Sequence, residues 1–186
     1  MTKTLLVVAL ESEFKNKSIH DIVYTGVGKV NAVSAVANYI IKHGKPDLII
    51  NYGTAGIVSN KDIVGTLVQP DVIVQRDMMA EPQAPRGITP FEETDYAGTI
   101  MMNTNTNITL GTGDSFVMSQ DPWFVYANVD LVDMEAYAIA KFSAIQDIEF
   151  KCYKYVSDFA DEDAAKDWQQ NVAKGQNLFD EILGII

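Results

Sequence analysis

Apolar residues in this chain follow two kinds of pattern. Residues 4–10 and 47–52 are mainly consecutive apolar positions, which is typical of strands buried on both faces of a parallel sheet. Shorter runs of the same kind predict further strands at 22–27, 67–75, 108–110 and 149–156. Pro70 interrupts one of these runs, because proline cannot donate a hydrogen bond to a neighbouring strand.

Apolar residues spaced three and four apart predict helices between the strands. The first helix is expected at 29–43, with an apolar stripe at Val30, Val33, Ala37, Ile40 and Ile41. Gly44 stands where a helix C-cap belongs. A helix rich in small residues is expected at 131–146, and an amphipathic helix at 161–186 with Trp168 on its apolar stripe.

Residues 78–106 lack periodicity and contain Pro82, Pro85 and Pro90, so we expect a long loop, and such loops are usually binding loops or disordered. Elsewhere the strands alternate with helices. This order predicts an α/β fold, a single-domain three-layer α/β/α sandwich with a mixed, largely parallel central sheet. A chain of 186 residues and 20.5 kDa can bury one such core, so we expect one domain over 1–186.

The composition excludes several classes of partner. Asp and Glu total 25 against 14 Lys and Arg, which gives a net charge of −11. An acidic surface does not favour binding to nucleic acid or to an anionic membrane, whereas a nucleoside carries little charge. The lone Cys152 allows no internal disulfide and is expected to be a small buried residue. We find no apolar run long enough for a membrane helix and no signal peptide, so the expected location is the cytoplasm.

Polar residues and glycines follow the predicted strands, where open α/β sheets bind ligands. They are Glu11 and Glu13, then Gly53, Thr54 and Gly56, then Gly113, Asp114 and Phe116, and finally Ser157 and Asp158. Each has a structural alternative. The two glutamates could begin a helix, Thr54 and Gly56 could form a turn, Phe116 could be core, and Asp158 could cap the last helix. Glu135 is different, because a carboxylate on the apolar face of a helix needs a partner.

Other kinds of chemistry find little support. The segment TGVGKVN lacks the third glycine of a dinucleotide-binding motif, since Asn31 stands there. His20 and His43 belong to no cluster with metal-ligand spacing, so we expect no metal site. A nucleophile elbow, GxSxG, is also missing.

Six segments together resemble a known family. They are ALESE (9–13), TGVGKVNA (25–32), IINYGTAG (49–56), TGDSF (112–116), VDMEAYAIA (132–140) and VSDFAD (156–161). In this order they resemble the nucleoside phosphorylase superfamily, and most of all its 5′-methylthioadenosine/S-adenosylhomocysteine nucleosidases. The resemblance extends from residue 4 to the end of the chain. The chain is short for the family, because a helix and strands usually found between Glu13 and Ile22 are missing.

The resemblance implies hydrolysis of the N-glycosidic bond of a purine nucleoside without a cofactor. Asp158, held by Ser157, matches the acid that protonates the purine ring. Glu135 matches the carboxylate that binds the ribose hydroxyls, and Glu13 matches the base that activates water. The other matches are substrate-binding positions: Phe116 stacking on adenine, Val117 beside the base edge, Met134 lining the ribose, Thr54 and Gly56 at the water pocket, and Lys154 where the family often has arginine.

Two alternatives to a hydrolase remain open. A phosphorylase must hold a phosphate dianion, usually with arginines. Asn51 stands where similar phosphorylases have one of these arginines, and Glu11 and Glu13 stand near the place of another, so water is the expected nucleophile. A non-catalytic nucleoside-binding protein is the other alternative, although it would not need both Glu13 and Asp158.

The resemblance also implies a homodimer, because in similar enzymes a neighbouring subunit helps to close the 5′ end of the site. Segment 78–106 differs from the corresponding loop of typical nucleosidases, which leaves the 5′ substituent open. We expect this segment to set the 5′ preference. Arg76 and Arg86 could face the ligand, or they could pair with acidic residues of the segment, namely Glu81, Glu92 and Glu93.

Overall fold

The computed structural model describes residues 2–184, which form nine strands and five helices. The strands are β1 Thr4–Val8, β2 Asp21–Tyr24, β3 Leu48–Ile57, β4 Leu67–Val68, β5 Val72–Gln75, β6 Thr99–Met101, β7 Thr109–Thr112, β8 Leu131–Asp133 and β9 Glu149–Phe159. The helices are α1 Lys29–His43, α2 Pro122–Tyr126, α3 Ala136–Ile145, α4 Ala164–Asn171 and α5 Gln176–Leu183.

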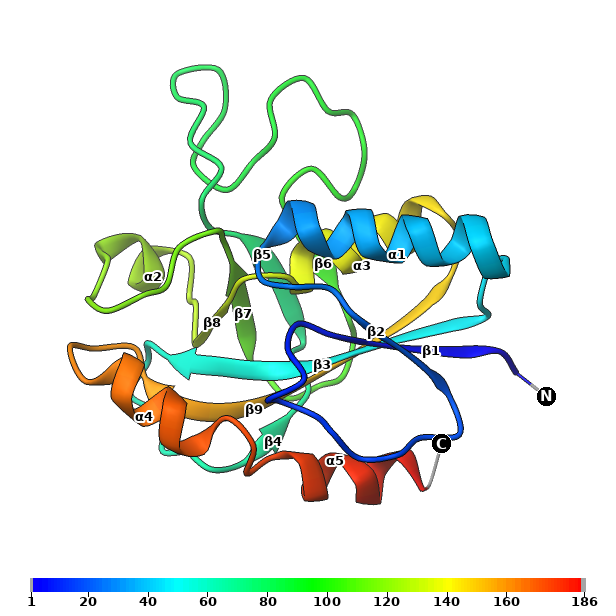
Figure 1. The fold of residues 1–186 in the computed structure, drawn as a ribbon. Coiled ribbons are helices and arrows are strands. Elements are labelled where there is room, and N and C mark those ends of the chain that lie inside the picture. The colour runs from blue at the N-terminus through cyan, green and yellow to red at the C-terminus, as the bar shows by residue number, and fades with distance from the viewer. Residues whose placement is uncertain (1, 185–186) are drawn as a thin grey trace.

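All nine strands belong to one sheet with the order β2-β1-β3-β8-β7-β5-β6, and β9 pairs with both β3 and β4. Most pairs are parallel, and the antiparallel ones are β3 with β8, β4 with β9, and β5 with β6. Helices α1 and α3 lie on one side of the sheet and α4 and α5 on the other (Figure 1). The predicted fold class, an α/β sandwich with a mixed and largely parallel sheet, is confirmed.

The two most apolar strands lie at the centre of the fold. Every residue of β1 is buried, and β3 is buried except at Thr54. On one face Leu5, Val7 and Ile49 pack with residues of α1 and α3. On the other face the rings of Tyr52 and Phe179 stack with centroids 4.2 Å apart. Continuous apolar runs are needed because helices cover both faces of these strands.

Several predicted strands have different limits. Strand β3 continues to Ile57 and β9 to Phe159, so Thr54, Gly56, Ser157 and Asp158 lie inside strands. Asp158 therefore does not cap the last helix. The run at 67–75 divides at Pro70 into β4 and β5. Strand β2 stops at Tyr24 and is partly exposed, because it lies at the edge of the sheet.

The helix predicted at 131–146 begins later than expected. Residues 131–133 form strand β8, and α3 starts at Ala136. Glu135 is consequently the N-cap residue of α3 and does not lie on a helix face. The apolar residues of β8 were mistaken for helix because a run of three cannot show whether its period is two or 3.6. The short helix α2 was not predicted.

The closing helix predicted at 161–186 is two helices, and its last two positions, 185 and 186, lie outside the described residues. The break falls at Gly175, where a Cβ atom would lie 2.4 Å from Cγ of Tyr155 and 2.6 Å from the hydroxyl of Tyr52. The chain passes so close to the sheet here that only glycine fits. This close approach allows α5 to pack Phe179 against Tyr52 while α4 covers the carboxyl end of β9.

Segment 78–106 is largely irregular, as predicted, but it includes the short strand β6 at its end. In Figure 1 the part before β6 forms green loops that extend away from the sheet beyond α1. Among residues 2–184, no helix combines the length and the apolar character needed to cross a bilayer.

Candidate active site

A cavity of about 180 Å³ lies where β1, β3 and β9 end, between the loop after β7 and helix α4. Nine of the ten residues that the sequence predicted for the site line it: Glu13, Thr54, Gly56, Phe116, Val117, Met134, Glu135, Ser157 and Asp158. These residues come from five separate parts of the chain. The cavity thus confirms that the strand-end residues meet, while their roles remain predictions.

Glu13 is held in one orientation by three hydrogen bonds. It follows β1 in a turn and is buried. Its Oε1 accepts hydrogen bonds from the backbone N–H and the hydroxyl of Thr54, both at 2.8 Å, and its Oε2 accepts one from the N–H of Leu10 at 3.1 Å. A buried carboxylate needs such donors, so Glu13 does not merely begin a solvated helix. Glu11, by contrast, is exposed and does not line the cavity.

Asp158 lies on β9 with its carboxyl group against the end of β3. Its Oδ2 accepts a hydrogen bond of 2.5 Å from the Ser157 hydroxyl. Burial raises the pKa of Asp158 to about 6, the Ser157 hydrogen bond opposes the rise, and the negative charges of Asp167 and Asp161 add to it. A Cβ atom at Gly56 would lie 2.9 Å from Oδ1 of Asp158, so Gly56 is required for the carboxyl group to reach this place.

Glu135 links the N-terminus of α3 to the N-terminus of α1 through a hydrogen bond. As the N-cap residue of α3 it accepts a hydrogen bond of 2.8 Å from the backbone N–H of Gly28, just before α1. The pKa of Glu135 is raised to about 7, first by burial and then by the negative charge of Asp133, while Lys154 and the Gly28 N–H oppose the rise. Carboxyl groups with raised pKa values in a cleft are typical of functional sites.

Asp133 is a buried carboxylate that the sequence reasoning missed. Its Oδ2 contacts Nζ of Lys154 at 2.9 Å and accepts a hydrogen bond from the N–H of Ala136 at 2.9 Å, and its Oδ1 accepts one from the hydroxyl of Thr112 at 2.5 Å. Asp133 thereby holds the first turn of α3, on which Glu135 depends. Its position two residues before Glu135 in VDMEA was the available signal.

Lys154 does not line the cavity, contrary to its predicted role in substrate binding. Its side chain is only 1% exposed and is paired with Asp133, which itself lines the cavity. Burial alone would lower the pKa of Lys154, but the negative charge of Asp133 raises it above the usual value. The lysine is therefore a charged partner of Asp133 within the protein.

The apolar wall of the cavity comes from Phe116, Val117 and Met134. Phe116 is 47% exposed, so it is not a core residue and its ring is free to stack on a planar ligand. The loop that carries it is held by Arg76, whose guanidinium donates to the carbonyls of Gly111 at 3.2 Å and Gly113 at 2.9 Å and to the Ser115 hydroxyl at 2.9 Å.

Segment 78–106 contributes no residue to the lining of this cavity. Arg86, which was expected to face the ligand or to pair with Glu81, Glu92 or Glu93, instead forms an ion pair of 2.6 Å with Asp121 and lies over the ring of Trp123. Glu92 pairs with Lys141 at 2.5 Å. Within a single chain the segment does not reach the cavity, and its effect on the 5′ preference stays a prediction.

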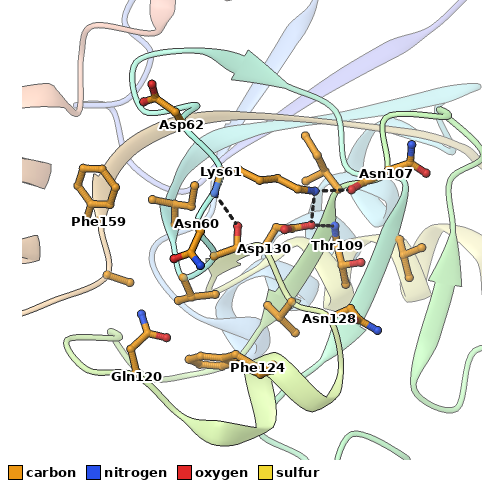
Figure 2. A pocket seen from close by; sticks show the side chains of 18 of the residues that line it. Asn60, Lys61, Asp62, Asn107, Thr109, Gln120, Phe124, Asn128, Asp130 and Phe159 are labelled. Atoms are coloured by element: carbon orange, nitrogen blue, oxygen red, sulfur yellow. Dashed lines mark hydrogen bonds and ion pairs between the residues drawn. The ribbon is translucent and has the colours of Figure 1, made fainter.

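A larger hollow of about 1140 Å³ lies elsewhere, between α2, the loop after β3 and residues 159–161 (Figure 2). None of the three predicted catalytic carboxylates lines it. In its lining, Lys61 contacts Asp130 at 2.8 Å, and Asp130 also accepts a hydrogen bond from the N–H of Thr109 at 3.1 Å. The smaller cavity, with its buried carboxylates, is therefore the candidate active site.

Within the described part of the chain, no group of three or more His, Cys, Asp or Glu residues is arranged to hold a metal ion. Cys152 is buried as expected, and burial raises the pKa of its thiol to about 12.

Comparisons with known proteins identify the family to which this mixed α/β sheet and its acidic cavity belong. The model of the Phosphorylase superfamily matches residues 21–184. A 5′-methylthioadenosine/S-adenosylhomocysteine nucleosidase of Staphylococcus haemolyticus is 30% identical over 177 residues, which is 86% of this chain and 72% of that protein. This chain belongs to the Phosphorylase superfamily.

Solved structures show the same fold. A Helicobacter pylori 5′-methylthioadenosine nucleosidase mutant with 5′-methylthioadenosine in its active site has a TM-score of 0.86 at 16% identity, covering 100% of both chains. A mutant futalosine hydrolase of the same organism has a TM-score of 0.84 at 16% identity, also covering 100% of both chains. At such identities the likeness concerns the fold, which nucleosidases with different substrates share.

Proposed function

We propose that this protein hydrolyses the N-glycosidic bond of a purine nucleoside, with 5′-methylthioadenosine, S-adenosylhomocysteine or a related adenosine derivative as substrate. The observation that carries the proposal is the convergence of three buried carboxyl groups, Glu13, Glu135 and Asp158, on one cavity with an exposed aromatic ring. A binding protein has no need for three buried acids, because each costs free energy to desolvate.

In the proposed reaction the bond from C1′ of the ribose to the purine nitrogen breaks, and its electron pair leaves with the base. Protonated Asp158 donates its proton to the purine ring, which makes the base a neutral leaving group. The ribose gains positive charge, which the carboxylate of Glu135 stabilises while it binds the sugar hydroxyls. Glu13 accepts a proton from water as the water oxygen bonds to C1′. The products are free sugar and free base.

The cavity favours water over phosphate as the nucleophile. Arg76 is the cationic residue in its lining, and its guanidinium already makes four hydrogen bonds, one to Gly111 of β7 and three to the loop that follows. Asn51, at the position of a phosphorylase arginine, is buried and donates to the carbonyl of Val7 at 3.0 Å. Together with the carboxylates, this arrangement would repel a phosphate dianion.

A phosphate-free assay tests this proposal. We expect base release at the same rate in buffer with and without inorganic phosphate, with the free sugar as product. A strict requirement for phosphate, with sugar 1-phosphate as product, would instead assign the protein to the phosphorylases. A panel of methylthioadenosine, adenosylhomocysteine, adenosine, inosine and futalosine then identifies the substrate, and binding of all of them without turnover would favour the non-catalytic alternative.

We also propose that the protein is a homodimer in which segment 78–106 contacts the second subunit. Support comes from its extension beyond α1 and from the large apolar side chains it leaves in solvent, with Phe91 90% and Met79 66% exposed. Apolar side chains on a protruding segment are typical of interaction sites. We expect light scattering to give about twice the chain mass of 20.5 kDa, and the mass of a single chain would contradict the proposal.

A further inference from the structure

Helix α4 reaches the cavity through Trp168, whose indole ring forms part of the lining. The pattern of apolar positions places this residue on the buried stripe of a long helix, but in the structure it is only half-buried. Its Nε1 donates a hydrogen bond of 3.0 Å to the hydroxyl oxygen of Thr54. The same hydroxyl group donates to Oε1 of Glu13 at 2.8 Å.

The direction of this chain of hydrogen bonds is determined by its ends. An indole N–H can only donate, and an ionised carboxylate can only accept. The Thr54 hydroxyl lies between them with a single proton. It must accept from Trp168, and its own proton must therefore point to Glu13. Hydrogen bonds in such a series strengthen one another by polarisation.

Helix α4 is itself attached to the strand that carries the proposed acid. The side-chain amide of Asn171 donates to the backbone carbonyl of Ser157 at 2.6 Å, and the negative charge of Asp167 contributes to the raised pKa of Asp158. Helix α4 thus contacts residues next to both the proposed general base, Glu13, and the proposed general acid, Asp158.

We propose that Trp168 is a positioning residue for Glu13 that acts through the Thr54 hydroxyl. The packing of α4 against the sheet then determines the orientation of the Glu13 carboxylate. This inference rests on the proposed function for its catalytic meaning. The hydrogen-bonded relay itself can be measured without any turnover.

Nuclear magnetic resonance offers that measurement, because the chain has two tryptophans, Trp123 and Trp168, and so gives two indole N–H signals. Trp168→Phe identifies the signal of Trp168, and Trp123→Phe is the matched control that must leave it in place. We expect Thr54→Val and Glu13→Ala each to shift this signal and to speed its exchange with solvent. An unchanged signal in either variant would overturn the relay, whether or not the protein releases a base.

Kinetics test the catalytic consequence. Trp168→Phe keeps an aromatic ring and removes only the donor, so we expect kcat to fall roughly 3- to 10-fold, the worth of one net hydrogen bond, with KM nearly unchanged. The double variant Trp168→Phe/Thr54→Val should be no slower than Thr54→Val alone, since both act through one hydroxyl. A rise in KM with normal kcat, or fully additive losses, would show that the indole only contacts substrate and would contradict the proposal. If the wild-type protein releases no base, the proposed function fails while the spectra still decide the relay.

Discussion

Asp158→Asn is expected to fold normally and to lose roughly two to four orders of magnitude in kcat, the usual range for a general acid. Asparagine has the same shape and can still accept from Ser157, but it has no acidic proton to give to the purine. Base release from the purified variant measures the loss. The matched control is Asp163→Asn, an exposed N-cap residue of α4 whose side chain makes no capping hydrogen bond, and it should retain nearly full activity.

The raised pKa of Asp158 gives this prediction a pH dependence. Because burial raises the pKa to about 6, the protonated fraction in the free protein falls as pH rises above that value. We expect kcat/KM of the wild-type protein to decline over the same range. The free energy of unfolding changes with pH in the same direction, because the native state binds the Asp158 proton more tightly than the unfolded chain does. The stability that Asp158 contributes is complete below the unfolded pKa near 3.8 and is lost as pH rises through about 6. Asp158→Asn should lack this decline, and an unchanged decline in the variant would contradict the role of Asp158 as an acid.

Glu13→Gln is expected to lower kcat by at least about two orders of magnitude, again the scale of general acid–base catalysis, with a smaller change in KM. A glutamine can keep the hydrogen bonds from Thr54 and Leu10 through its oxygen, but it cannot accept the proton of the attacking water. Steady-state assays of base release separate the two parameters. Circular dichroism and thermal melting confirm that the fold is intact.

Glu11→Gln provides the control for this second variant, because Glu11 lies two positions before Glu13, is exposed, and does not line the cavity. It should leave kcat unchanged. Equal losses in the two variants would mean that the charge of the segment after β1 matters in general and that Glu13 has no special role.

The order of strands and helices could be predicted from local pattern, since buried runs and periodic stripes are properties of short segments. Element limits were harder. The division of the last helix at Gly175 depends on Tyr52 and Tyr155, which are distant in sequence, and no periodicity within 161–186 contains that information. Strand β8 could not be separated from α3 because its pairing partners, β3 and β7, lie elsewhere in the chain.

Local sequence features were enough to predict the fold class and ten candidate site residues, nine of which line the cavity, because strand-end positions and the family's motifs are both local features. Only the tertiary structure decided how those residues are used. It pairs Lys154 with Asp133 and Arg86 with Asp121, and it places the indole of Trp168 within hydrogen-bond distance of Thr54. Each of these contacts joins positions more than twenty residues apart. Their energies depend on burial and distance, which exist only once the chain has folded.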